Sequence, residues 1–437
     1  MTNTSPDELV RLTAIETAAV LAVACGPLLA KGVMVRRPWI VGLLQATGIE
    51  RSSVALLQRL RRRYGTGPVM LRLPGREQAV LLSLDQVRRV LADTPEPFET
   101  DSSEKHATLA HFEPEGSLIS RGTVRAERRV LNERALESDC PVHSLAPRFR
   151  NIVAEEIAAL FQAGGDKEEL GWGSFKDSWF QIARRCLFGD HAADDRALID
   201  MLIRLRSAGN WAFLHPKRGV LRAQFLSRVA AYVHNPAPGT LAERLSAYAT
   251  SRAAAEDQVA QWLFAFDAAG IATFRALAVL ASTDRLLERA RNDAGPELPF
   301  LRACLLESVR LWPTTPAILR LSDRATDWNG SIMPKDTGVL IHVPFLHRDD
   351  ARLPFAHRFV PDIWLDGDAA AWPLIPFSAG PGECPAKNLV LLLASNTLAT
   401  LLTEHRFALP PSRPINPDQL PATFDHFSLV LRSQSLN

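Results

Sequence analysis

The sequence predicts a mainly α-helical fold with small β-sheets, and three stretches carry that prediction. The stretch from Glu256 to Ser282 is apolar nearly all round, which is typical of a helix that runs through a core. Residues 150–235 show the periodicity of several amphipathic helices. The apolar runs 69–73 and 79–82 flank a Pro-Gly turn and predict a β-hairpin.

Composition narrows the class of protein. A chain of 437 residues with 47% hydrophobic residues can form two or three average domains or one large fold. The formal net charge is only +2, which implies no strong attraction to nucleic acid, so we expect no nucleic-acid partner. The five cysteines are scattered and never form a Cys-x-x-Cys pair, which argues against a disulfide framework or zinc site and for a reducing compartment.

The N-terminal region contains an uncharged stretch, residues 17–30, interrupted by Gly26-Pro27. It is shorter than the ~20 apolar residues that span a bilayer. The acidic residues Asp7, Glu8 and Glu16 before it are unlike the positive flank of a signal peptide. We therefore expect a cytoplasmic protein, with a peripheral membrane contact through residues 28–37 as the alternative.

The next elements follow in order. Residues 51–64 alternate apolar and basic at helical spacing, and the helix ends at a Gly- and Pro-containing segment. After the hairpin, residues 84–91 return to helix. Residues 96–120 are polar with Pro and Gly and predict a long loop, a feature that is usually functional or disordered.

Arg125 and Arg129 lie one helical turn apart on one face. Two guanidinium groups so placed suit the recognition of a carboxylate. A solvated basic face is the alternative.

The long apolar helix contains the sequence Ala269-Gly270-Ile271-Ala272-Thr273. Ala269 and Thr273 share a face, so a gap lies beside a hydroxyl. Alternatively, Gly270 and Thr273 serve only close helix packing. Further along, Glu307 and Arg310 stand in an apolar helix, where a charged pair is costly unless it is satisfied.

Residues 377–386, Phe-Ser-Ala-Gly-Pro-Gly-Glu-Cys-Pro-Ala, precede an apolar helical run. We expect Pro385 at the first helical position, so that amide groups point at the sulfur of Cys384 and lower its pKa. A thiolate is the form that binds metal. The alternative is a buried structural cysteine.

From about residue 50 to the C-terminus, these stretches and their order resemble the cytochrome P450 family. Phe377, Gly380 and Cys384 match its loop pattern Phe-x-x-Gly-x-(His/Arg)-x-Cys-x-Gly, from which Gly382 and Ala386 depart. The helix motif is similar to (Ala/Gly)-Gly-x-(Asp/Glu)-Thr, with Ala272 in place of the acid. The resemblance implies a single large, mainly α domain over residues 50–437, preceded by an N-terminal helical extension, residues 1–49.

The same resemblance implies haem b as cofactor, with Cys384 as the axial ligand in a loop shaped by Phe377 and Gly380. It makes Arg125, Arg129 and Arg320 propionate partners and Ala269, Gly270 and Thr273 catalytic. It joins Arg358 to Glu307 and Arg310 in a buried structural network. The substrate pocket that it implies has six members: Phe112, Ile119, Phe213, Ala317, Ile318 and Phe424.

The activity implied is monooxygenation of a small hydrophobic molecule with electrons from a separate ferredoxin or flavodoxin and its reductase. Lys387 and Arg128 are candidate docking cations for that partner. Ala272 carries no proton, and Asp267 cannot replace the acid because it lies about 140° away around the helix. A peroxide-driven oxygenase, a haem isomerase and a catalytically silent haem-binding partner subunit are therefore alternatives. A cysteine hydrolase is disfavoured, since no histidine partner for Cys384 can be argued.

Overall fold

The structure is a computed structural model that describes residues 8–164, 169–250, 253–370 and 374–436. Its α-helices are α1 Ala14–Ala19, α2 Gly26–Lys31, α3 Pro38–Thr47, α4 Ile49–Tyr64, α5 Leu84–Ala92, α6 Ser103–Leu109, α7 Gly122–Leu136, α8 Ala146–Gly164, α9 Trp172–Phe188, α10 Arg196–Gly209, α11 Gly219–His234, α12 Leu241–Tyr248, α13 Ala255–Leu280, α14 Asp284–Arg291, α15 Pro299–Leu311, α16 Val343–His347, α17 Asp362–Leu365 and α18 Lys387–Glu404. Its strands are β1 Val69–Met70, β2 Gln78–Val80, β3 Phe98–Glu99, β4 Glu169–Gly171, β5 Ala317–Ser322, β6 Thr326–Trp328, β7 Ser331–Met333, β8 Gly338–His342, β9 His405–Ala408 and β10 Val430–Ser435.

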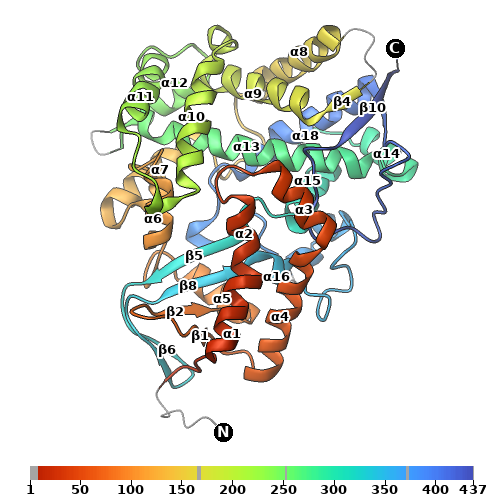
Figure 1. Cartoon of the computed structure of the whole chain (residues 1–437). Helices are drawn as coiled ribbons and strands as arrows, with labels where there is room; N and C mark the ends of the chain where they lie inside the picture. The colour runs from red at the N-terminus through yellow and green to blue at the C-terminus, as the bar shows by residue number, and fades with distance from the viewer. Residues whose placement is uncertain (1–7, 165–168, 251–252, 371–373, 437) are drawn as a thin grey trace.

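The prediction of a mainly helical fold with small sheets is confirmed. Figure 1 shows helices α8 to α13 gathered at one end of the molecule, and the largest sheet at the other end beside α1, α2 and α4. Each end has its own large hydrophobic cluster.

Helix α13 runs through the helical end, as its apolar sequence predicts. Every residue from Gly270 to Leu280 is buried. A Cβ at Gly270 would lie 2.7 Å from the ring of Trp179 in α9, and the indole Nε1 of Trp179 donates to the Phe266 carbonyl at 2.7 Å. The glycine therefore lets α9 and α13 approach closely.

The largest sheet has the strand order β1-β2-β8-β5-β3. The predicted hairpin is present, with Val69 opposite Val80, and β2 then pairs in parallel with β8. The prediction of a loop over residues 96–120 is wrong. Phe98 pairs with Ser322 of β5, and Ser102 caps α6 by accepting a hydrogen bond from the Lys105 amide.

The C-terminal strand β10 pairs with β4 and β9 in a three-stranded sheet. Residues 423–427 lie in the loop that connects β9 to β10. Partners distant in sequence decide this pairing, so no local turn signal could predict it.

The described part of the N-terminal region is mostly helical, as the resemblance implies. α1, a π-helical segment at Val20–Cys25 and α2 follow one another without the expected break at Gly26-Pro27. Pro27 lies in the first turn of α2, where a missing amide costs little. By length and composition, Ala14–Lys31 and α13 could each cross a membrane, and the bent pair α3 and α4 would make a third such segment if it is counted as one.

The predicted boundary after residue 49 stays a prediction. Of the predicted extension, residues 1–7 lie outside the described residues. Leu12 donates its amide to the Met70 carbonyl at 2.9 Å, and Leu9 and Leu12 are buried in the hydrophobic cluster of the sheet. The described residues up to Cys25 therefore pack onto the same core as the strands.

Glu307 and Arg310 of α15 form a fully buried ion pair with two hydrogen bonds, at 2.6 and 2.7 Å. The carboxylate also accepts from the Val360 amide at 2.8 Å and the indole of Trp364 at 3.0 Å. Arg358 requires a correction, because only its carbonyl joins this network, accepting from Arg310 at 2.7 Å. Its exposed guanidinium instead pairs with Asp418.

The network reaches the segment that carries Cys384, residues 377–386, through His347. We call this segment the cysteine loop. Arg310 donates to the His347 carbonyl at 2.9 Å, and the Ile375 amide donates to Nε2 of the same residue at 2.9 Å. Burial lowers the pKa of His347 to about 3, so the ring is neutral and its Nδ1–H donates to the Arg310 carbonyl. The chain just before Phe377 is thus anchored to α15.

Arg310→Met should lower the free energy of unfolding by about 3–5 kcal/mol, because it leaves the Glu307 carboxylate buried without its cation. Urea unfolding followed by circular dichroism measures this change. Arg358→Ala is the control and should stay within about 0.5 kcal/mol of the unmodified protein. Equal losses for the two variants would place Arg358 back in the network.

Glu113 is a second buried acid, and unlike Glu307 it has no hydrogen-bond partner among the described residues. The residue is only 1% exposed. Burial raises its pKa from 4.5 to about 8, against the opposing effect of Arg206 and Lys105.

The folded protein therefore keeps the Glu113 proton up to about pH 8, whereas the unfolded chain releases it near pH 4.5. The free energy of unfolding should fall across this interval as the pH rises. Glu113→Gln should remove that part of the fall, so its stability relative to the unmodified protein should grow from pH 5 to pH 8 in urea titrations. Glu297→Gln, at an exposed site, is the control and should leave the pH dependence of the free energy of unfolding unchanged. If Glu113→Gln showed the same pH dependence as this control, the raised pKa of Glu113 would be contradicted.

Candidate functional site

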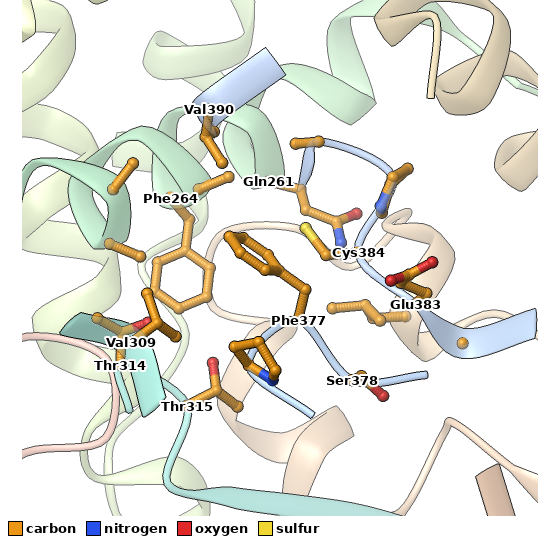
Figure 2. A pocket seen from close by; sticks show the side chains of 18 of the residues that line it. Gln261, Phe264, Val309, Thr314, Thr315, Phe377, Ser378, Glu383, Cys384 and Val390 are labelled. Carbon is orange, nitrogen blue, oxygen red and sulfur yellow. The ribbon is translucent and has the colours of Figure 1, made fainter. Parts of the chain in front are cut away.

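A cavity of about 240 Å³ lies between α13, α15, β5 and the cysteine loop. Figure 2 shows Phe264 of α13 reaching into it together with Phe377 and Cys384 of the cysteine loop. On one side stands the thiol of Cys384. On the other is a face of α13 made of four alanines: Ala265, Ala268, Ala269 and Ala272.

The loop before Cys384 is shaped by short-range constraints. Gly380 has a φ of +63°, and a Cβ there would lie 2.4 Å from the Leu91 carbonyl at the end of α5, so only glycine fits. The Cys384 amide donates to the Phe377 carbonyl at 2.9 Å and closes the loop. Helix α18 begins at Lys387, two residues later than expected, so the prediction that Pro385 opens it is wrong.

The prediction that the helix start lowers the pKa of Cys384 is also wrong for the polypeptide without a coordinating metal ion. Burial raises the pKa of this thiol, although a hydrogen bond from the Ala386 amide and the charge of Arg129 act in the opposite direction. Desolvation outweighs one amide and one neighbouring cation. A coordinating metal ion deprotonates a thiol outright, and these two groups would then stabilise the thiolate.

Two arginines of α7 bind backbone carbonyl oxygens of the cysteine loop. Arg125 donates to Pro381 at 3.4 Å and Arg129 to Glu383 at 2.6 Å. Arg125 is only 8% exposed, which rules out the alternative of a solvated basic face. Arg129 lines the cavity and also pairs with Glu133.

Arg320 of β5 takes the space beside the loop. A Cβ at Gly382 would lie 2.7 Å from its Nη2 atom, and its Nε donates to the Thr94 hydroxyl at 3.0 Å. The cysteine-loop pattern has a basic side chain where this chain has Gly382. Here a guanidinium from the neighbouring strand lies at that position instead.

Lys105 of α6 is a fourth cation at the cavity, and the sequence analysis missed it. Its ammonium group donates to the Thr100 carbonyl at 2.6 Å and the Leu319 carbonyl at 3.1 Å. Burial lowers its pKa well below the ordinary value. The capping residue Ser102 is the signal that could have revealed the helix carrying it.

These cations test whether haem b fits the site. Among the described residues, Lys105, Arg125 and Arg320 have no carboxylate partner, and they donate only to carbonyl and hydroxyl oxygens. Buried cations without a counter-charge are costly. Burial lowers the pKa of Arg320 to about 10. The two propionates of haem b would supply the missing negative charges, and the thiol of Cys384 supplies an iron ligand, so the residues fit the cofactor.

The α13 motif is only partly at the cavity. Ala269 and Ala272 line it, whereas Thr273 is buried and donates its hydroxyl to the Ala269 carbonyl at 2.8 Å. Gly270 faces Trp179 of α9. Asp267 pairs with Arg206 at 2.7 Å and is not among the residues that line the cavity, as its position on the helix predicts.

The predicted substrate residues divide into several groups. Ala317 and Ile318 line the cavity, and Phe112 packs behind it, edge-on to Phe264 with ring centres 6.2 Å apart. Ile119 is buried beside Leu118, which lines the cavity. The side chain of Phe213 is 71% exposed and is therefore not a wall. Phe424 lines a second, smaller cavity.

Comparison with known proteins points to one family. Residues 281–434 match the family model described as Cytochrome P450. The probable cytochrome P450 12b2, mitochondrial, of Drosophila melanogaster is 31% identical over 131 residues, which cover 27% of this chain and 24% of that protein. The beta-amyrin 24-hydroxylase of Glycine max is 32% identical over 117 residues, which cover 24% of this chain and 23% of that protein. The chain thus spans about a quarter of the length of these curated relatives.

The likeness in fold extends much further. Retinoic acid-bound cyanobacterial CYP120A1 superposes with a TM-score of 0.69 at 18% identity, covering 87% of this chain and 94% of that chain. CYP175A1 from Thermus thermophilus gives 0.67 at 18% identity, covering 90% and 96%. The family model spans the Glu307–Arg310 pair and the Cys384 loop, and the fold agrees over nearly the whole chain. In a matched segment of its sequence and in its fold, this chain is similar to cytochromes P450.

Proposed function

We propose that the protein is a haem-dependent monooxygenase that inserts one oxygen atom of dioxygen into a hydrophobic small molecule. One observation carries the proposal. The cavity has the thiol of Cys384 on one side, small side chains of α13 on the other and apolar walls between them. A site of this kind binds an apolar molecule next to a reactive centre.

Haem b would be held by Cys384 and, at its propionates, by Arg125, Arg129, Arg320 and Lys105. When bound through a thiolate, it supplies the activation of dioxygen. The chain's own residues do the rest. Apolar side chains such as Phe264, Ile318 and Val309 exclude water and orient the substrate.

Proton supply is where this chain departs from the cytochrome P450 pattern. Ala272 lines the cavity but has no proton to give, and the Asp267 carboxylate is engaged by Arg206. We propose that Thr273 Oγ1, now donating to the Ala269 carbonyl, rotates to hold a water that carries protons into the cavity. The catalytic role of Thr273 and Ala269 rests on that hydroxyl.

A peroxide-driven oxygenase is the second candidate, and the missing acid at Ala272 favours it. Hydrogen peroxide brings both oxygen and protons, so this chemistry needs no proton relay from α13. A haem isomerase has the same advantage. A silent haem-binding subunit would bind ligands without turning them over.

Electrons would come from a separate ferredoxin or flavodoxin with its reductase. The two candidate docking cations are partly neutralised within the chain, since Lys387 pairs with Glu383 at 2.8 Å and Arg128 pairs with Glu115. The proposed docking surface therefore contributes orientation more than net charge. We also propose a cytoplasmic location, which the five unpaired cysteines support.

Cys384→Ser should abolish the spectrum typical of a thiolate-ligated, reduced carbon monoxide complex, because serine does not replace a thiolate ligand. Absorbance spectroscopy on the purified protein supplied with hemin measures it. Cys140→Ser, at an exposed site, is the control and should keep the spectrum. The proposal fails if the Cys384→Ser spectrum equals that of the control.

Ala272→Asp should raise the fraction of electrons that reach product about tenfold if proton supply limits turnover, a modest share of the 10²–10⁴ that acid catalysis can contribute. Product formed per reducing equivalent is the measurement. Ala272→Asn, of the same size but without an acidic proton, should not raise it. Turnover of the unmodified protein with peroxide but not with reduced ferredoxin would favour the second candidate.

A further inference from the structure

A second cavity, of about 40 Å³, lies beside the first and beneath the N-terminal helices. α2, α3 and the middle of α13 wall it, together with the segment that follows α15 and residues 422–424. Figure 1 shows α2 and α3 on this side of the molecule, near α15. Thr314 lines both cavities, so the two spaces adjoin there. A water needs about 10–15 Å³ of such space, so a carboxylate fits.

The lining of this cavity carries excess positive charge. Its charged residues are Lys31, Arg36, Arg275 and a single acid, Glu50. Glu50 is already engaged, because one oxygen pairs with Lys31 and the other accepts from the Thr423 hydroxyl. In the part of the chain that the structure describes, Arg36 and Arg275 are thus left without a carboxylate partner.

Both guanidinium groups donate their hydrogen bonds to neutral acceptors. Arg36 donates to the carbonyls of Gly32 and Thr314. Arg275 donates to the carbonyls of Trp312 and Phe424 and to Nδ1 of His426, each at 3.2 Å. The residue is only 8% exposed, and its Nε has no partner among the described residues. Burial, with repulsion between the two, lowers the pKa of Arg275 to about 9; burial also lowers that of Arg36 to about 10.

A purely structural role does not account for this charge. Carbonyl groups satisfy hydrogen-bond donors but do not neutralise a buried cation, and neutral donors would tie the N-terminal helices down at lower cost. An anion in the cavity would supply the missing charge and a partner for the free Nε. Arg is suited to bind a carboxylate by two parallel hydrogen bonds.

We infer that this cationic cavity binds the carboxylate of the substrate, so that the substrate is an apolar carboxylic acid. Its anionic end lies against Arg36 and Arg275, and its apolar body passes Thr314 into the main cavity. Ile271 and Phe424 give the smaller cavity an apolar part of its wall. The inference rests on the proposed function only for the oxidation of this acid. Binding of the acid is measured independently of oxidation.

Isothermal titration calorimetry of the haem-loaded full chain tests whether the cavity binds a carboxylate. The two ligands, dodecanoate and dodecanol, have the same number of carbons and differ in the charged end group. The unmodified protein should bind dodecanoate at least about tenfold more tightly than dodecanol. Arg275→Met should weaken dodecanoate binding about tenfold or more, as expected for a lost charged hydrogen bond, and change dodecanol binding less than about twofold. Arg36→Met should act in the same way and covers the case in which Arg275→Met does not fold.

Arg37→Met is the matched control, because Arg37 donates to the Leu29 and Ala30 carbonyls and does not line the cavity. It should leave both affinities unchanged. Equal binding of the acid and the alcohol, or equal losses of both in the Arg275 and Arg36 variants, would overturn the inference. Acetate binding as tight as dodecanoate binding would also overturn it, since the site would then serve a free anion.

The same titrations separate this inference from the proposed function. Selective dodecanoate binding without any oxidised product would contradict the monooxygenase proposal alone. Oxidation of apolar compounds with no preference for the acid would contradict the carboxylate site alone.

Discussion

The buried ion pair between Glu307 and Arg310 is the constraint on which the site depends. Both side chains are fully buried, so each oxygen and each nitrogen must find its partner in a fixed direction. Arg310 binds the His347 carbonyl, and the His347 ring binds the Ile375 amide. A charge pair in α15 thereby determines where the chain enters the loop that carries Cys384.

The same loop is held from the opposite side by α7. Arg125 and Arg129 bind its carbonyl oxygens, and Arg320 fills the space left by Gly382. Within the described residues, Lys105, Arg125 and Arg320 near the loop have no carboxylate partner. The departure at Gly382 is thus offset by a neighbouring strand, and the positive charge that a haem propionate needs is retained.

Charged and apolar side chains occupy different parts of the walls of the two cavities. One group of cations lies beside the cysteine loop, and a second, Arg36 and Arg275, lies beneath the N-terminal helices. The main cavity between them is walled by alanines of α13 and by aromatic and aliphatic side chains. An arrangement of this kind favours a ligand with one anionic end and an apolar body, and it gives the N-terminal helices a role in recognition.

The sequence by itself determined the helical class, the core helix α13, the first hairpin, the ligand candidate Cys384 and the Glu307–Arg310 pair. These follow from periodicity, turn chemistry and the cost of burying charge, which are local or depend on residues close in the chain. Tertiary structure alone decided that Arg358 turns to solvent, that Phe213 is exposed and that Lys105 and Arg275 become buried cations. Burial and hydrogen-bond partners depend on segments far apart in the chain, such as Lys105 and Leu319. For the same reason the pKa of Cys384 is raised where its helix position predicted a lower one.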